Sequence, residues 1–223
     1  MLCVATASIL VPPSASAALS PRPAFTIADP RGVAPLYPAG GDVAPDGTRY
    51  VADSGRSRIV AISDRGRQRV VSPERAGWND PRDLEVDVRR PRVLWVANTS
   101  AEQVVKLDRD GTVLERFGGF AQVYGIANDR RGVYVADTYA NRVVKIAKRS
   151  GAERWSTGAC FGDGFVRPRD VAVGSNGDVY VADTDNDRIV RLSASGGACL
   201  DEFGAAGAAP GQLNAPRALT SDG

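Results

Sequence analysis

Three aspartates along the chain are each followed five positions later by an arginine: Asp53 by Arg58, Asp137 by Arg142, and Asp183 by Arg188. A carboxylate and a guanidinium at this spacing can form a charge-assisted hydrogen bond across a tight turn. The aspartate can also accept the backbone N–H groups of the turn that follows it. We therefore expect three Asp–Arg pairs that staple turns. The alternative is that these loops together form a polar surface for a ligand.

The chain contains no histidine. Histidine is the usual general base near neutral pH and the commonest metal ligand in proteins. No Ser-His-Asp or Cys-His nucleophile can therefore form within these 223 residues. A phosphate-binding P-loop is also missing, and so is a Gly-x-Gly-x-x-Gly motif before a helix. These absences favour a role that is not enzymatic.

The chain begins with an apolar stretch, Leu2 to Val11, which leads to the small-residue pattern Ala15-Ser16-Ala17. This layout is typical of a secretory signal peptide over residues 1–17, although a positive n-region is missing. An unprocessed apolar leader is the alternative. No other segment is long and apolar enough for a membrane helix. The sequence therefore predicts a secreted or extracytoplasmic protein without a membrane span.

Two cysteines, Cys160 and Cys199, lie beyond this leader, which carries Cys3. An exported protein meets conditions in which disulfides form. The two residues are 39 positions apart and neither belongs to a C-x-x-C motif. Whether they pair depends on a distance that the sequence does not show. A disulfide and two unpaired buried thiols both stay open.

An aromatic residue, a valine, an alanine and an Asp or Asn recur four times, with spacings of 45, 39 and 46 residues. Such a period is typical of propeller blades, solenoids and other arrays. The last full repeat predicts four strands, over 168–173, 179–183, 188–192 and 198–203. Asn176-Gly177 predicts a type I′ turn between the first two. Four antiparallel strands in about 40 residues make one propeller blade.

The earlier repeats show the same order of short strands, and no repeat contains an amphipathic helix. The aromatic residue of each motif keeps its register, so we expect these rings to pack between blades: Tyr50, Trp95, Tyr134 and Tyr180. Residues 216–223 repeat the start of the last full copy. We expect them to begin a fifth blade in a fragment of a longer propeller. Residues 25–28 are a candidate for its closing strand.

The motif Tyr180-Val-Ala-Asp183-Thr184-x-Asn186-x-Arg188, preceded by Pro168-Arg-x-Val-Ala-Val and Asn176-Gly177, closely resembles the NHL repeat. The resemblance covers residues 38–223, with four full copies and the start of a fifth. It implies an all-β fold, a propeller with about four complete four-stranded blades and a partial fifth, as part of a six-bladed ring. Residues 18–37 would be a linker or the closing strand. The second copy lacks both the Asp and the Arg of the signature, which argues against a catalytic role for that loop.

Propellers similar to NHL repeats include lyases that use histidine as a zinc ligand or as a base. Neither chemistry fits a chain without histidine. Metal-dependent lactonases of the gluconolactonase and regucalcin type hold a central ion with oxygen ligands, which suits calcium or another divalent ion. That alternative resemblance implies candidate ligands on the inner strands: Asp83, Glu85, Asn128 and Asp170. Asp83 and Asp170 both follow a Pro-Arg dipeptide, which the repeat alone explains.

The sequence favours a non-catalytic binding scaffold without a cofactor, whose partner is a protein, a peptide or a glycan. Trp78 and Tyr139 are out of register with the repeated aromatics, so we expect them to be recognition contacts in loops. An RNA-binding NHL module is a further alternative, because arginines cluster over 65–69 and 89–92. The net charge of only +2 gives nucleic acid no overall electrostatic support.

Overall fold

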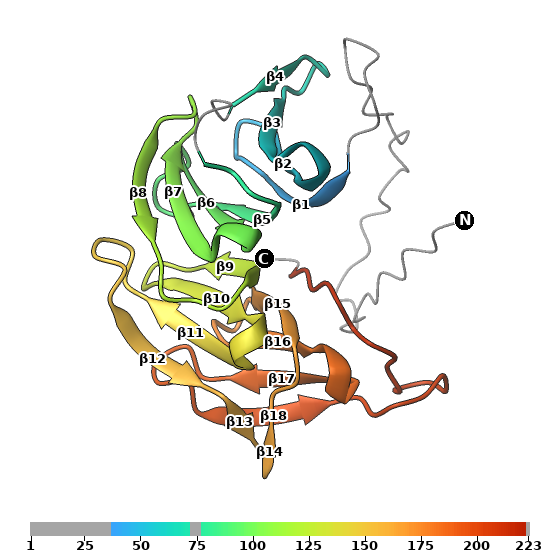
Figure 1. Cartoon of the computed structure of the whole chain (residues 1–223). Helices are drawn as coiled ribbons and strands as arrows, with labels where there is room; N and C mark the ends of the chain where they lie inside the picture. Colours follow the sequence, from blue (N-terminus) through green and yellow to red (C-terminus); the bar gives the residue numbers. More distant parts are fainter. Residues whose placement is uncertain (1–36, 72–76, 222–223) are drawn as a thin grey trace.

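The computed structural model describes residues 37–71 and 77–221. Within these residues, the chain forms four antiparallel sheets of four strands that follow one another around a common centre (Figure 1). The expected signal peptide over 1–17 and the candidate closing strand over 25–28 lie outside the described residues. The architecture is the all-β propeller that the repeat predicts.

Each sheet is one blade, with its strands in chain order from the centre outward. Blade 1 contains β1 (Pro38–Val43), β2 (Arg49–Asp53), β3 (Arg58–Ile62) and β4 (Gln68–Val70). Blade 2 contains β5 (Pro81–Val86), β6 (Val93–Asn98), β7 (Gln103–Asp108) and β8 (Val113–Phe117). Blade 3 contains β9 (Val123–Asn128), β10 (Val133–Asp137), β11 (Arg142–Ile146) and β12 (Glu153–Thr157). Blade 4 contains β15 (Pro168–Val173), β16 (Val179–Asp183), β17 (Arg188–Leu192) and β18 (Cys199–Phe203).

The innermost strands β1, β5, β9 and β15 lie side by side around the centre of the ring. The second and third strands of each blade are joined by a short 3-10 helix: η1 (Ser54–Arg56), η2 (Thr99–Ala101), η3 (Thr138–Ala140) and η4 (Thr184–Asn186). The inner strands begin next to these helices, because Pro38, Val123 and Pro168 pair with the last residues of β2, β10 and β16. We call this side of the ring the turn face.

The hairpin between β15 and β16 differs from the predicted type I′ turn. Only Gly177 has a positive φ, of 80°, and the φ of Asn176 is not positive. The N–H of Gly177 donates to the carbonyl of Gly174 at 2.8 Å, and Asn176 accepts the N–H of Asp178 through its side chain. The asparagine therefore acts as a hydrogen-bond acceptor for the loop, and only the glycine supplies the left-handed conformation.

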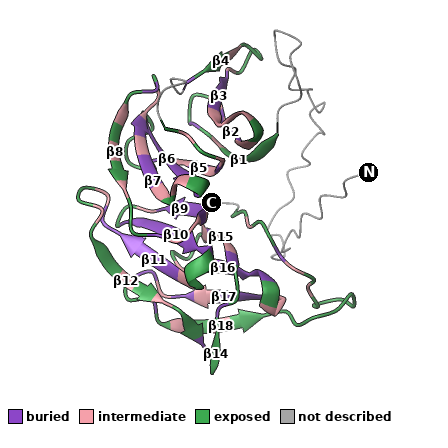
Figure 2. Ribbon diagram, viewed as in Figure 1, coloured by how far each residue is buried: buried purple, intermediate pink, exposed green. Residues whose placement is uncertain are grey.

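Apolar side chains fill the spaces between blades and leave the outer strands polar (Figure 2). Three clusters of buried residues each join two neighbouring blades. Tyr50, Trp95 and Tyr134 are almost fully buried in these clusters, and each packs against residues of the following blade. Tyr180 of blade 4 is only half-buried. The repeated aromatic therefore seals the junction between one blade and the next.

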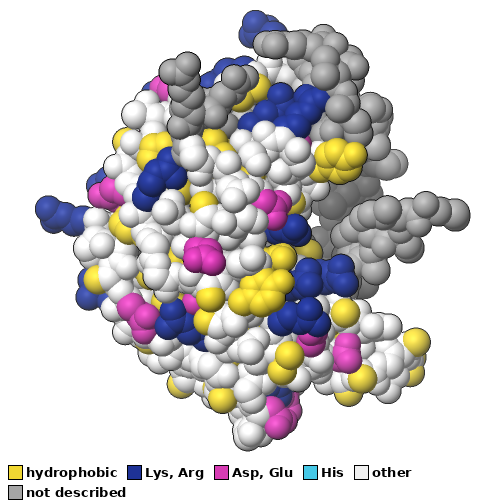
Figure 3. Space-filling model, in the orientation of Figure 1, with side chains coloured by type: hydrophobic (Ala, Val, Ile, Leu, Met, Phe, Trp, Pro, Cys, Tyr) yellow, Lys and Arg dark blue, Asp and Glu magenta, His cyan; other side chains and the backbone are white. Residues whose placement is uncertain are grey.

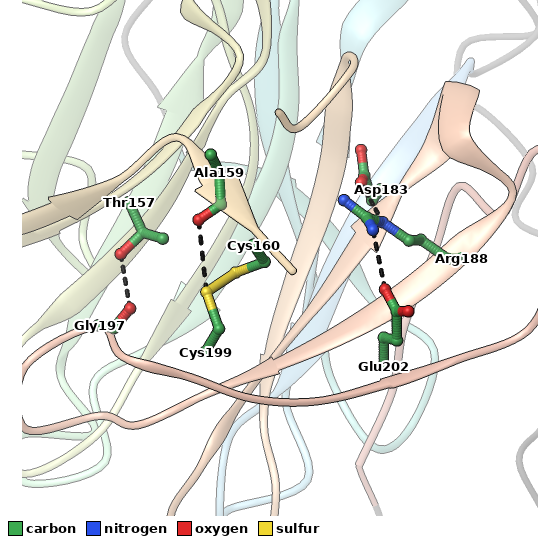
Figure 4. Close-up of a disulfide and its surroundings, with 8 residues drawn as sticks. All are labelled: Thr157, Ala159, Cys160, Asp183, Arg188, Gly197, Cys199 and Glu202. Carbon is green, nitrogen blue, oxygen red and sulfur yellow. Dashed lines mark hydrogen bonds and ion pairs between the residues drawn. A yellow bond between two sulfur atoms is a disulfide. The ribbon is translucent and has the colours of Figure 1, made fainter. Parts of the chain in front are cut away.

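A short hairpin that the repeat pattern did not reveal lies between blades 3 and 4, formed by β13 (Ala159–Cys160) and β14 (Asp163–Gly164). Cys160 of this hairpin forms a disulfide with Cys199 of β18, and their Cα atoms are 5.6 Å apart (Figure 4). Nearby, the hydroxyl of Thr157 donates to the carbonyl of Gly197 at 2.7 Å. The bridge thus joins the connection after blade 3 to the outer strand of blade 4.

In blades 2, 3 and 4, the threonine that follows the signature Asp or Asn links the blade to the next inner segment. Thr99 Oγ1 donates to the carbonyl of Val123 at 2.5 Å, and Thr138 Oγ1 donates to that of Pro168 at 2.7 Å. Thr184 makes the same 2.7 Å bond to Pro216. Residues 216–219 therefore occupy the place of a next inner strand, as the sequence predicted, although they pair in no sheet.

Gly125 of β9 lies against the inner strand of blade 4 with no room for a side chain. A Cβ at this position would lie 2.5 Å from the Cα of Asp170 and 2.4 Å from its Oδ1 atom. Gly118, by contrast, has nothing within 4 Å and no positive φ. The two glycines form a matched pair for testing the close approach of blades 3 and 4.

We expect Gly125→Ala to destabilise the fold by about 3 kcal/mol, because backbone must move to admit the methyl group. The midpoint of thermal unfolding should fall by about 10 °C. Gly118→Ala should be neutral or slightly stabilising, because it restricts only the unfolded chain. Thermal unfolding of both variants checks this, and similar midpoints for the two would contradict the close packing.

Candidate functional site at the centre of the ring

A cavity of about 1050 Å³ occupies the centre of the ring. It is lined by residues of all four inner strands and of the segment 217–221. Because the inner strands share one register, equivalent residues lie at the same depth. At the turn face the second positions are Arg82, Tyr124, Arg169 and Arg217, and the next positions are Asp83, Gly125, Asp170 and Ala218.

The carboxylates of Asp83 and Asp170 hold neighbouring backbones. Asp83 accepts the N–H of Leu84 on its own strand and the N–H of Ile126 in blade 3, both at 2.9 Å. Asp170 accepts the N–H of Val171 at 2.9 Å and that of Leu219 at 2.6 Å. Each side chain thus uses both of its oxygens on backbone N–H groups, one of them from the following inner strand.

Asp42 of β1 has the same arrangement two positions further along its strand, level with Glu85 of β5. Its Oδ1 atom accepts the N–H of Val43 at 2.6 Å, and its Oδ2 atom accepts the N–H of Val86 in blade 2 at 2.9 Å. Three acidic side chains of the cavity wall therefore bind backbone across blade junctions. This arrangement keeps their oxygens occupied in the unliganded protein.

Burial changes the acidity of the two matched aspartates. Burial, followed by the charge of Asp170, raises the pKa of Asp83 well above its ordinary range. Burial likewise raises the pKa of Asp170 to about 7, against the lowering effect of its two backbone hydrogen bonds. Two carboxylates that face each other across Gly125 cannot both ionise cheaply in a low-dielectric cavity.

Glu85 differs from these aspartates because no backbone N–H binds its carboxylate among the residues that the structure describes. Its contact is with the amide of Asn128, whose Nδ2 atom lies 3.4 Å from Oε2. Burial, and then the charges of Asp42 and Asp170, raise the pKa of Glu85 to about 8. Glu85 is therefore largely protonated at neutral pH and can both donate and accept a hydrogen bond.

Asn128 is engaged with blade 2 and with a lysine. Its Nδ2 atom donates to the carbonyl of Val86 at 2.9 Å, while its Oδ1 atom accepts the N–H of Val88 at 3.1 Å and the ammonium of Lys148 at 2.6 Å. Lys148 also pairs with the buried Asp87 at 2.9 Å. The amide oxygen has little capacity left for another ligand.

The four candidate metal ligands do line one cavity, but their geometry does not fit an ion. Within residues 37–71 and 77–221, no three acidic or cysteine side chains come close enough together to hold a metal. The oxygens of Asp83 and Asp170 are bound to backbone N–H groups, and Asn128 Oδ1 faces an ammonium. A divalent cation would have to displace these contacts, so the donor set does not suit it.

The three Asp–Arg pairs lie outside this cavity, at the start of each 3-10 helix. Arg58 Nε lies 2.7 Å from Asp53 Oδ2, Arg142 Nε 2.9 Å from Asp137 Oδ2, and Arg188 Nε 2.8 Å from Asp183 Oδ2. Figure 4 shows that Arg188 also reaches Glu202, at 2.8 Å. All three aspartates are fully buried.

The expected capping of the following turn was wrong. None of these aspartates caps its 3-10 helix. The Oδ1 atoms instead accept N–H groups from the segment that enters the same blade: Tyr37 at 3.1 Å, Ala121 at 2.7 Å and Val166 at 2.8 Å. Each aspartate therefore fastens the entry of its blade to the turn between the second and third strands.

Asn98 performs the same task in blade 2 without a charge. Its Oδ1 atom accepts the N–H of Asn79 at 2.8 Å, and its Nδ2 atom donates to the carbonyl of Gly77 at 3.0 Å. The amide replaces the missing arginine as a second link to the entering segment. The substitution in the second repeat thus preserves the structural role of the motif.

The two aromatic candidates differ in exposure. Tyr139 in η3 is 56% exposed on the turn face. Trp78 is half-buried and packs against the core of blades 1 and 2, and its buried Nε1 has no hydrogen-bond partner among the described residues. Tyr139 is therefore the better placed of the two to meet a partner.

The two arginine-rich segments approach each other around one aspartate. Arg69 and Arg92 lie 3.9 Å and 3.5 Å from the two carboxylate oxygens of Asp110. Arg109 lies 3.1 Å from Asp46. Part of the positive charge of this region is thus compensated by acidic neighbours.

Sequence reasoning missed the cationic group at the entrance of the cavity. The guanidinium carbons of Arg82 and Arg169 lie 4.8 Å and 5.2 Å from the centre of the Tyr124 ring. Such distances are typical of cation–π contacts. The recurrence of Pro-Arg at 81–82, 168–169 and 216–217 was the signal that could have found this group.

The arrangement of blades around a central channel defines the class of the protein as a β-propeller. A sequence model of the NHL repeat matches residues 165–192, which span β15 to β17. This match, together with the four blades, identifies the chain as an NHL-repeat propeller. No curated protein sequence matches the chain.

Solved structures of the same fold include several enzymes. A streptogramin B lyase is 16% identical with a TM-score of 0.63, over 74% of this chain and 54% of the lyase. Virginiamycin B lyase from Staphylococcus aureus is 18% identical with a TM-score of 0.62, over 74% of this chain and 55% of that one. A gluconolactonase from Xanthomonas campestris is 19% identical with a TM-score of 0.61, over 83% and 65%. The chain thus spans about half of the length of the lyases, and these similarities show the fold alone.

Removal of one signature aspartate should separate its two roles. We expect Asp183→Ala to cost about 3 kcal/mol, because Arg188 would stay buried without its carboxylate. Asp183→Asn should cost less, since the amide can still accept the Val166 N–H as Asn98 does in blade 2. Asp110→Ala, at an exposed ion pair, should change stability by less than about 0.5 kcal/mol. Urea unfolding measures the stability of all three variants. Equal losses for Asp183→Ala and Asp183→Asn would contradict the separate roles of Asp183 in pairing with Arg188 and in accepting the Val166 N–H group.

Glu85 should make stability depend on pH. Because its folded pKa, about 8, lies above its ordinary value, the folded state binds the proton more tightly than the unfolded state. Its contribution is fully present below pH 4 and is lost as the pH rises towards 8 and beyond. We expect Glu85→Gln to gain stability relative to the wild type between pH 5 and pH 9, as measured by thermal midpoints. A difference between the two proteins that stays constant with pH would contradict the burial of this carboxyl.

Proposed function

We propose that this propeller is a secreted, non-catalytic binding module whose protein, peptide or glycan partner contacts the turn face around the channel entrance. The observation that carries the proposal is the occupancy of the channel carboxylates. Asp42, Asp83 and Asp170 each bind two backbone N–H groups, one of them in the next blade or segment. Side chains used in this way stabilise the ring and are poorly suited to react.

The turn face supplies groups suited to recognition. Tyr139 exposes more than half of its surface, and tyrosine provides a large, rigid and amphipathic contact. Near the centre of the ring, basic side chains lie beside hydrophobic ones (Figure 3). Mixed surfaces of this kind, with aromatic and arginine side chains, are typical of binding sites.

Export of the protein is supported by the disulfide and by the leader pattern of the sequence. The Cys160–Cys199 bridge joins two parts of the chain that are 39 residues apart. Such bridges persist mainly in secreted and extracytoplasmic proteins. No helix among the described residues is long and apolar enough to cross a membrane.

A lactonase is the second candidate function, because a gluconolactonase shares this fold and because acidic side chains line the channel. The occupied oxygens of Asp83 and Asp170 do not favour the divalent cation that such chemistry would use. Among the described residues, the channel carboxyl of Glu85 contacts only the amide of Asn128. RNA binding by the arginine-rich segments has less support, because Asp110 and Asp46 compensate part of their charge.

Two assays of the purified chain test the proposal. We expect no hydrolysis of aldonolactones above the background rate, with calcium or with EDTA. On arrays of glycans and peptides, we expect saturable binding that Tyr139→Ala weakens about tenfold, as at an interface anchor. Phe161→Ala removes an equally exposed ring from the β13–β14 hairpin, remote from the channel, and should leave binding unchanged. Lactone turnover, or no saturable ligand on either array, would overturn the proposal.

A further inference from the structure

We propose that Arg82, Tyr124 and Arg169 form a binding site for the carboxylate of an acidic saccharide, whose sugar hydroxyls extend into the channel beneath. The inference names the ligand class of the recognition site and rests on the proposed binding function. It is built from the entrance group, the cavity below it and the hydrogen-bonding groups of the channel wall.

The three side chains come from neighbouring blades. Tyr124 lies on β9, and the flanking strands β5 and β15 supply Arg82 and Arg169. Each guanidinium carbon is within about 5 Å of the same ring centre, at 4.8 Å and 5.2 Å. The contact with the ring positions both guanidinium groups at the cavity, where each can bind an anion. Planar guanidinium groups match the geometry of a carboxylate and bind it with two parallel hydrogen bonds.

The cationic charge at this entrance is only partly compensated, because Arg82 pairs with Asp80. No carboxylate pairs with Arg169 or Arg217 among the residues that the structure describes, and the buried Nε of Arg169 has no hydrogen-bond partner there. Arg82 is different, because its Nε donates to Asp80 at 2.8 Å. This contact restrains the Arg82 side chain. A buried donor without a partner carries a desolvation cost that a bound anion would remove.

The groups beneath the entrance suit hydroxyls. Glu85 contacts only the amide of Asn128. Its carboxyl therefore keeps an oxygen that can accept a hydrogen bond from a sugar hydroxyl. A second anionic group at this depth would meet Asp42, Asp83 and Asp170, which repel it. A ligand with one acidic end and a neutral, hydroxyl-rich remainder fits both levels.

The cavity has room for more than one sugar. Its volume of about 1050 Å³ is at the upper end of the range found for small-molecule sites. Because guanidinium groups already lie over the Tyr124 ring, that ring is not available for stacking on a sugar. The tyrosine thus serves to position the arginines, and Arg82 and Arg169 make the direct contacts.

The test measures binding of 3′-sialyllactose, which has one carboxylate and a neutral lactose end, to the full chain by calorimetry, with its methyl ester as the neutral counterpart. We expect saturable binding that the methyl ester reproduces at least about tenfold more weakly, because charged hydrogen bonds are lost. Arg169→Gln should weaken sialyllactose binding by a similar factor, and Arg169→Lys should recover part of it. Arg65→Gln removes the same charge from an exposed turn and should have no effect. Thermal midpoints establish that each variant is folded.

The alternatives give distinct results. Equal binding of the methyl ester, or an equal loss in the Arg65 and Arg169 variants, would overturn a specific carboxylate site. Binding of N-acetyl-dialanine as tightly as sialyllactose would assign the site to peptide carboxylates and overturn the saccharide. If sialyllactose does not bind but the arrays yield another ligand, this inference fails while the proposed function stands. If lactones are turned over, the proposed function itself fails.

Discussion

Hydrogen bonds from the backbone of one inner strand to a carboxylate of the preceding strand connect the blades of this propeller. They join Val86 to Asp42, Ile126 to Asp83 and Leu219 to Asp170. Inner strands of neighbouring blades do not pair as a sheet, so their N–H groups need another acceptor in the interior. The carboxylates of the preceding inner strand accept these N–H groups at the centre of the ring. Acidic residues of the described part of the chain thus line the channel with oxygens that already accept backbone N–H groups.

This arrangement constrains what can stand at the matched positions of neighbouring blades. Asp83 and Asp170 alternate with Gly40 and Gly125, and a Cβ at either glycine would lie 2.4 Å from the neighbouring Oδ1 atom. An aspartate in every blade would also add further buried charges close to one another, which is costly. The alternation of aspartate and glycine thus avoids both a steric clash and the close approach of further carboxylates. Burial raises the pKa of both Asp83 and Asp170, and the charge of Asp170 raises that of Asp83 further.

Much of the fold was predictable because the signals are local and repeated. The strand boundaries of blade 4 follow from β-branched runs between turn residues, and the ion pair of Asp183 with Arg188 follows from their spacing across one turn. The second partner of Asp183 was not predictable, since Val166 lies 17 residues earlier and meets it only through the closure of the blade. Sequence likewise could not decide the disulfide, because β13 and β14 are too short to leave a pattern. The repeated Pro-Arg pairs were visible, but their convergence on Tyr124 depends on the ring.

The same geometry supports placing the charged contact of the proposed recognition at the turn face and not deeper in the channel. Moving along β5 from Arg82 to Asp83, the environment changes from a cationic entrance to buried carboxyls that hold the next blade. A substitution at the level of Asp83 disturbs a blade junction. A substitution at the level of Arg82 removes a contact at the entrance and leaves the junction intact. In the proposed binding module, ligand specificity can therefore vary at Arg82, Tyr124 and Arg169 while the ring stays intact. Under that proposal, one level of each inner strand serves stability and the level above it serves binding.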